Sequence, residues 1–160
     1  MQDLEKVEKN VLEKGIKSSW LTIILGFNLS GLAYSLIISV YFFARKKGYL
    51  VEGWNEPIYA VIALIILSFG SLIIASKFTQ ITSIGRALLV NKITLIVCCS
   101  QFAAQFNLMF VLHYKRIFPL EPFQQIISIL IGGLIGFLLS MNKSINQRMI
   151  TQFYKINYWE

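Results

Sequence analysis

Few side chains in this 160-residue chain belong to the types that carry out covalent, acid–base or metal chemistry. Its single histidine is His113, and its two cysteines, Cys98 and Cys99, are adjacent. Neighbouring residues of a helix point about 100° apart, so no disulfide is expected between them. The sequence lacks the H-E-x-x-H, G-x-S-x-G and C-x-x-C motifs, and a single histidine excludes a bis-histidine haem within one chain. We therefore expect no metal ion and no cofactor.

An enzymatic function would need the acidic residues of the loops to act together. Glu52, Glu56 and Glu121 fall in loops expected on one side, and they would have to converge on His113. Acidic residues that flank apolar segments more often simply keep loops in water. The sequence therefore predicts no catalytic residues and favours a non-enzymatic protein.

Amide side chains inside apolar segments are the polar groups best suited to a specific interaction. We single out Asn28, Gln101, Gln105 and Asn107, of which the two glutamines lie one helical turn apart. Two further amides, Gln124 and Gln125, lie at the start of the fourth window. An amide in hydrocarbon needs a partner, although interhelical hydrogen bonds contribute only about 0.6 kcal/mol on average. These amides either clamp neighbouring helices or form the polar lining of a narrow pathway or pocket. We expect the clamp, because polar residues in spans usually face the bundle interior.

Four charge-free apolar windows must position these amides. A helix needs about 20 apolar residues to cross a hydrocarbon core of roughly 30 Å. The windows meet this length, with 27, 20, 22 and 21 residues: Ser18–Ala44, Pro57–Ser76, Ile93–Tyr114 and Pro122–Asn142. With 56% hydrophobic and 14% charged residues, the composition agrees. The sequence predicts an all-α integral membrane protein with a four-transmembrane-helix bundle.

The expected organisation has three parts. Residues 1–17 form an amphipathic N-terminal helix, residues 18–142 the transmembrane domain, and residues 143–160 an interfacial aromatic and basic tail. The spans are expected at about residues 20–43, 57–76, 93–113 and 123–142. Between the second and third spans, Ile81, Ile84 and Leu88 recur at helical spacing, which fits an interfacial helix or an extension of the second span. In the tail, one helical face would carry Ile145, Met149, Phe153 and Ile156.

Small residues at helical spacing predict where the spans pack. Lipid gives helices no hydrophobic reason to associate, so close backbone approach matters most. The first span carries Gly31, Ser35 and Ser39, and the fourth carries Gly132, Gly136 and Ser140. A third stripe, in the third span, consists of Ser100, Ala103, Ala104 and Asn107. These stripes favour a compact bundle, and they leave open whether the fourth span packs within the chain or against another copy.

The basic residues predict the orientation of the chain. Of the 15, ten belong to the N-terminal segment, the second loop and the C-terminal tail, and five belong to the other two loops. The positive-inside rule then places both termini in the cytoplasm, or in the matrix of an organelle. The cluster Arg45-Lys46-Lys47 opposes this assignment. We interpret the net charge of +7 as the result of basic residues that set the membrane topology and attract lipid headgroups. We expect no nucleic acid as a partner.

Two functions fit these features. The first is an accessory or scaffold subunit of a membrane complex, which contacts the lipid bilayer and either other membrane subunits or copies of itself. The second is a small oligomeric channel or pore lined by Asn28, Gln101, Gln105 and Asn107. The expected location is a bacterial cytoplasmic membrane or an organellar inner membrane.

Overall fold

Helices make up nearly all of the described chain. The structure, a computed structural model, describes residues 16–49, 56–113 and 122–154. In chain order its elements are β1 Ile16–Lys17, α2 Ser19–Lys46, α3 Glu56–Phe78, β2 Gln80–Ile81, α4 Ile84–His113, α5 Pro122–Ser140 and α6 Lys143–Tyr154. The expected all-α class is confirmed.

Four of these helices are long and apolar enough to cross a membrane. They are α2, α3, α4 and α5, with mean hydropathy between 1.6 and 2.6 in their most apolar windows. At 1.5 Å per residue, the 30 residues of α4 extend about 45 Å, well beyond a hydrocarbon core of about 30 Å. The helix begins at Ile84, nine residues before the expected start at residue 93.

Of the segment between the second and third long helices, Ile84 and Leu88 belong to α4 and Ile81 to β2, so the alternative that it extends the second span was wrong. Helix α3 ends at Phe78, and the short strand β2 follows. The hydroxyl of Ser83 then accepts a hydrogen bond from the backbone N–H of Arg86 at 3.2 Å. This is an N-cap, which starts a new helix by satisfying one of its unpaired N–H groups.

The expected N-terminal helix over residues 1–17 also ends differently. Ile16 and Lys17 form β1, which pairs antiparallel with β2 through Ile16 opposite Ile81 and Lys17 opposite Gln80. The hydroxyl of Ser18 then caps α2 by accepting from the N–H of Leu21 at 3.3 Å. The rest of the expected helix lies outside the described residues.

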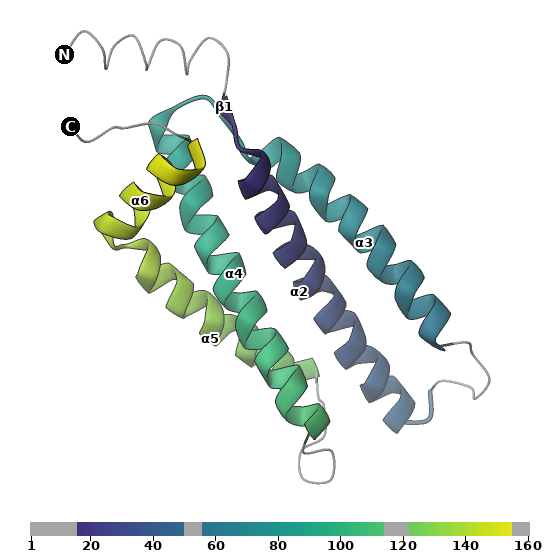
Figure 1. Cartoon of the computed structure of the whole chain (residues 1–160). Helices are drawn as coiled ribbons and strands as arrows, with labels where there is room; N and C mark the ends of the chain where they lie inside the picture. Colours follow the sequence, from purple (N-terminus) through teal and green to yellow (C-terminus); the bar gives the residue numbers. More distant parts are fainter. Residues whose placement is uncertain (1–15, 50–55, 114–121, 155–160) are drawn as a thin grey trace, which may run out of the picture.

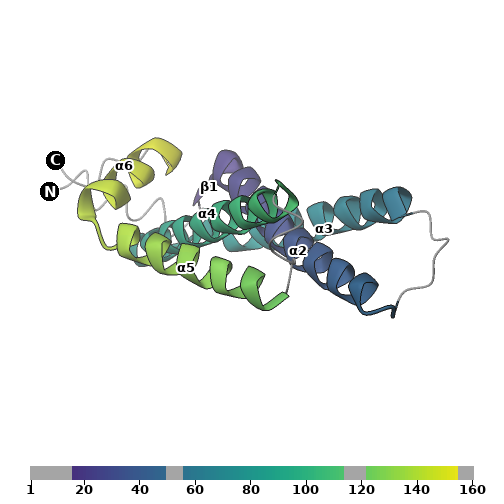
Figure 2. The same ribbon diagram turned by 90° about the horizontal axis from the view of Figure 1, so that it is seen from below.

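The four long helices lie in the order α3, α2, α4, α5 (Figures 1 and 2). The most extensive contacts join α4 to α5 and α2 to α3, and α2 also packs on α4 and, less extensively, on α5. Among the described elements, α3 has extended contacts only with α2 and β2. Of the bundle expected from sequence, α2, α4 and α5 pack on one another, whereas α3 packs on α2 alone among the long helices.

Helix α3 packs on α2 along one face, where Leu72 lies against Gly26 of α2. Ser71 and Ala75 are buried, whereas a Cβ atom added to Gly70 would meet open space. Most of the rest of its surface is exposed isoleucine, leucine and phenylalanine. Only 11% of its most apolar window is buried, against 39% for α4.

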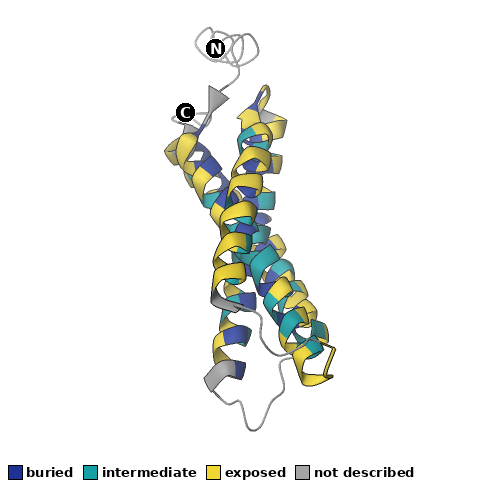
Figure 3. Ribbon diagram, turned by 90° about the vertical axis from the view of Figure 1, so that its right-hand side faces the viewer, coloured by how far each residue is buried: buried dark blue, intermediate teal, exposed yellow. Residues whose placement is uncertain are grey.

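Many residues buried between the long helices are small or polar, although Leu25, Leu108 and Val111 are buried too, and most of the large apolar residues are exposed. Figure 3 shows where the buried and exposed residues lie along the helices. Ser35, Ser39, Gln125 and Ser140 are fully buried, while exposed phenylalanines, isoleucines and leucines line the outer faces. This distribution is the reverse of that in a protein surrounded by water.

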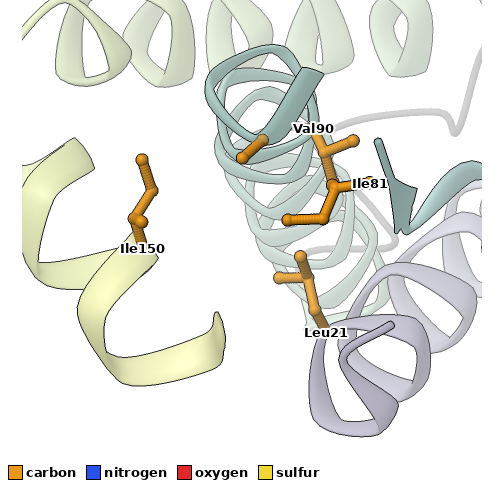
Figure 4. Packing of buried hydrophobic residues seen from close by; sticks show 5 residues of the cluster. Leu21, Ile81, Val90 and Ile150 are labelled. Atoms are coloured by element: carbon orange, nitrogen blue, oxygen red, sulfur yellow. The ribbon is translucent and has the colours of Figure 1, made fainter. Parts of the chain in front are cut away.

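A conventional hydrophobic cluster occurs only at one end of the described molecule, where β1, β2, α6 and the start of α4 meet (Figure 1). Its members come from distant parts of the chain: Leu21, Ile81, Ala87, Val90 and Ile150 (Figure 4). Apolar burial of this kind is favourable where water is the alternative. The cluster fastens α6 to the N-terminal extension of α4.

Helix α6 packs on the rest of the molecule through residues beside the apolar face expected for the tail. Asn146 and Ile150 are buried, and Ile145 and Met149 are only partly so. The reason is a polar corner between α5 and α6. The Asn142 side chain accepts from the N–H of Ser144 at 2.9 Å, and the Asn146 amide donates to the carbonyl oxygen of Ser140 at 2.6 Å. This corner turns Asn146 and Ile150 inward. Of the other two expected residues, Phe153 has no described side chain and Ile156 lies outside the described residues.

We expect Ile150→Ala to loosen α6, because truncating a fully buried isoleucine costs about 2–5 kcal/mol. Hydrogen exchange of the α6 amides should accelerate while exchange in the middle of α4 stays unchanged. Gln147→Ala, at an exposed position of the same helix, is the matched control. Unchanged α6 exchange in Ile150→Ala would show that the cluster does not hold this helix.

Candidate functional site

The closest helix contact in the described chain lies along one face of α5. A Cβ atom added to Gly136 would lie 2.7 Å from the Cα of Ile96 and 2.7 Å from the carbonyl oxygen of Leu95. One added to Gly132 would collide with the carbonyl oxygen of Cys99. These obstacles are backbone atoms, which cannot move aside as side-chain ends do. The backbones of α4 and α5 therefore touch at these two glycines.

The small-residue stripes predicted for the third and fourth spans meet at this contact. The added Cβ at Gly132 would also approach Ser100 and Ala103 of α4. Ser140 continues the stripe at the end of α5, where it is fully buried and its hydroxyl donates to the Phe137 carbonyl at 2.6 Å. We call this contact, from Gln125 to Ser140 on α5, the α4–α5 seam.

An amide pair closes the other end of the α4–α5 seam. The side-chain nitrogen of Asn107 donates to the Oε1 of Gln125 at 2.6 Å. The Nε2 of Gln125 in turn donates to the backbone carbonyl of Ala104 at 3.0 Å. Gln125 is fully buried. Two amides from different helices thus satisfy one another and one backbone group where water has little access.

The predicted stripe on α2 faces α4. A Cβ atom added to Gly31 would collide with the side-chain amide of Gln101. Ser35 and Ser39 are fully buried, and their hydroxyls donate to carbonyls of their own helix, Leu32 and Leu36. Hydroxyls bonded in this way bury no unsatisfied donor.

The four amides singled out from sequence do not share one environment. Asn28 donates to the carbonyl of Ile24 in its own helix at 2.8 Å. Gln101 is 8% exposed, and its Oε1 is buried with no hydrogen-bond partner among the described residues. Gln105 is half-buried, and its side chain has no hydrogen-bond partner among the described residues. Only Asn107 bonds to another helix.

A shallow lateral groove runs along the outer side of the α4–α5 seam. One part, of about 510 Å³, is walled by Phe102, Phe106, Ile131 and Ile135, and its neighbour, of about 250 Å³, adds Gln124 and Ile127. Asn107, Phe110 and Ser128 line both parts. Of the four predicted amides, Asn107 is the one that lines this groove.

Gln125 is the most important residue of the seam that the sequence did not single out. It lies seven residues before Gly132 and eleven before Gly136, so all three share one helical face. That spacing was the available signal. A second missed contact joins α2 to the residue that follows α3, where the Thr22 and Thr79 hydroxyls lie 2.6 Å apart and form a hydrogen bond.

Comparison with known proteins adds no constraint. No protein-family model, curated protein or solved structure matches the chain. Within the described residues, no three histidine, cysteine, aspartate or glutamate side chains are placed to hold a metal ion.

The first prediction from the α4–α5 seam compares the effects of alanine substitutions at two helical glycines. Gly136→Ala should destabilise the fold by about 1–3 kcal/mol, because the new methyl group meets the α4 backbone. Gly70→Ala makes the same chemical change where there is open space and should be neutral or slightly stabilising. Unfolding in mixed micelles would measure both, and equal effects would contradict the backbone contact.

The second prediction concerns the amide pair. A double-mutant cycle with Asn107→Leu, Gln125→Leu and both changes together should give a coupling of about 0.6 kcal/mol, and no more than about 1.7 kcal/mol. Each single change leaves a polar group unpaired, so the double variant should be less destabilised than the sum of the two. Strictly additive losses would mean that the two side chains act independently.

Proposed function

We propose that this chain is a non-enzymatic integral membrane protein that acts as an accessory or scaffold subunit of a membrane complex. Four helices of sufficient length and hydropathy support the membrane location. The outward-facing large apolar side chains support it further, because their exposure to water would be costly. Within that setting the four helices are transmembrane, and their neighbours are lipid or other proteins.

Both ends of the described chain fit one side of the membrane. β1, the β2 segment and α6 lie at the same end of the molecule (Figure 1), as four consecutive crossings require. The positive-inside rule favours the cytoplasm, or the matrix of an organelle, for this end. A bacterial cytoplasmic membrane and an organellar inner membrane both suit this orientation.

The main support for the proposed subunit function is the open arrangement of the helices. α3 is packed along α2 alone among the long helices, and 11% of its most apolar window is buried. A self-contained bundle of four helices normally packs every helix against two others. The α3 edge is therefore the side of the molecule that an additional membrane-spanning helix would complete.

A pore is the competing function, and the hydrogen bonds of the amides weigh against it. A polar lining needs amides turned to a common space, but Asn107 is bonded to Gln125 and Asn28 to its own helix. Gln101 lies against Gly31 in the contact between α2 and α4. These positions favour a role for the amides in helix packing.

Photo-crosslinking from defined helix faces tests this proposal. A photoreactive amino acid at Ile66 or Ile73, on the exposed side of α3, should capture another membrane protein in native membranes. The same probe at Leu134, exposed on α5, is the matched control for lipid-facing positions. The mild-detergent particle should exceed the 18.3 kDa of one chain, with the captured protein present in it.

Two outcomes would overturn the proposal. One is a particle of a single chain with no α3-specific crosslink. The other is a closed homo-oligomer that conducts ions or small solutes after reconstitution and loses this flux in the Gln101→Leu and Gln105→Leu double variant, because apolar constrictions gate by dewetting. The second result would establish the pore instead.

A further inference from the structure

We propose that the end of the molecule formed by β1, β2, α6 and the start of α4 binds the headgroups of anionic phospholipids. This inference rests on the membrane location proposed above but not on the subunit function. We call this surface the basic end. Among the basic side chains whose burial the structure describes there, five are exposed: Lys77, Arg86, Lys92, Lys143 and Arg148.

No acidic residue accompanies these bases in the described part of the chain. Glu56 is the only aspartate or glutamate there, and it begins α3 at the opposite end of the molecule. The sequence has none between Glu56 and Glu121, and none between Glu121 and Glu160. Residues 1–15 add four acids and three lysines, which nearly cancel. The basic end therefore keeps its positive charge.

Exposed apolar side chains alternate with these bases. Arg86, Leu89 and Lys92 follow one another at three-residue spacing, so they share a face of α4, and Leu89 is 53% exposed. Trp20, near the start of α2, is 72% exposed, and Met141, before Lys143, is 64% exposed. A lipid interface accommodates both kinds of side chain, with the apolar ones among acyl chains and the cations among phosphates.

The helix register places the bases at the depth of headgroups. Gly136 lies against Leu95 and Ile96, so the end of the antiparallel α5 at Ser140 comes level with Lys92. Lys143 follows directly, and Arg86 lies about 9 Å farther along α4. The bond between Thr22 and Thr79 brings the end of α3, with Lys77, to the start of α2. The bases thus ring the end of the apolar helices.

These observations favour lipid over other polyanions. A nucleic-acid surface is polar and basic throughout, and here leucine, tryptophan and methionine side chains are exposed among the cations. Each basic residue near the membrane surface raises the affinity for anionic lipid about fivefold. Removing two bases should therefore weaken binding about 25-fold.

The test measures lipid binding to the full-length chain in zwitterionic detergent. Phosphatidylglycerol and phosphatidylcholine are titrated separately and adducts are counted by native mass spectrometry. Wild-type protein should bind phosphatidylglycerol at least tenfold more tightly than phosphatidylcholine. The variant carrying Arg86→Gln and Lys92→Gln should lose most of that preference. The variant carrying Lys46→Gln and Lys47→Gln, which removes two exposed bases at the opposite end, should keep it.

Several results would overturn this inference. They are equal affinity for the two lipids, equal losses in the two variants, or displacement of the lipid by short DNA at comparable concentration. Circular dichroism and thermal unfolding of each variant separate lost binding from lost folding. A monomeric particle that prefers phosphatidylglycerol would leave this inference standing and remove the subunit function. A stable complex without lipid preference would do the reverse.

Discussion

The contact of α5 with the backbone of α4 is the constraint on which the rest of the structure depends. Helices surrounded by lipid gain little free energy from burying apolar surface against one another, so their association depends on close packing and on polar interactions. Gly132 and Gly136 permit the close packing, since even one methyl group would collide with the α4 backbone. Gln125 and Asn107 supply the polar bond at the far end. Helix α2 then packs on the pair through Gly31, and α3 packs on α2.

The molecule uses two kinds of cohesion in two places. Between the long helices many of the buried side chains are serine, glycine and amide, because small groups permit contact and hydroxyls bond to their own helix. At the basic end a hydrophobic cluster that includes Leu21, Ile81, Val90 and Ile150 is buried, as expected where water competes for apolar surface. This change of composition along the axis matches the boundary between hydrocarbon and water that the proposed location implies.

The sequence predicted the four long helices because charge-free apolar length is a direct physical requirement for crossing a membrane. Gly132 and Gly136 were also identifiable, since their spacing puts them on one face. Helix α4 starts before the expected span because Arg86 and Lys92, which lie before the charge-free window, are part of the helix that Ser83 caps. The open arrangement of α3 was not predictable from composition. The sequence does not distinguish a glycine that faces a neighbouring helix from one, such as Gly70, that faces open space. Gln125 was noticed only as a polar residue because its partner lies on another helix.

The distribution of contacts also bears on how the chain is made. The most extensive contacts join helices that are consecutive in the chain, α2 with α3 and α4 with α5. Each pair is a hairpin whose second member leaves the ribosome directly after the first, and domains generally fold in the order of their synthesis. The first hairpin can therefore assemble before the second has been translated. The face of α2 that carries Gly31 therefore stays without its partner until Gln101, 70 residues later in the chain, has been synthesised. During that interval this face is open to whatever insertion factor or chaperone accompanies the nascent chain.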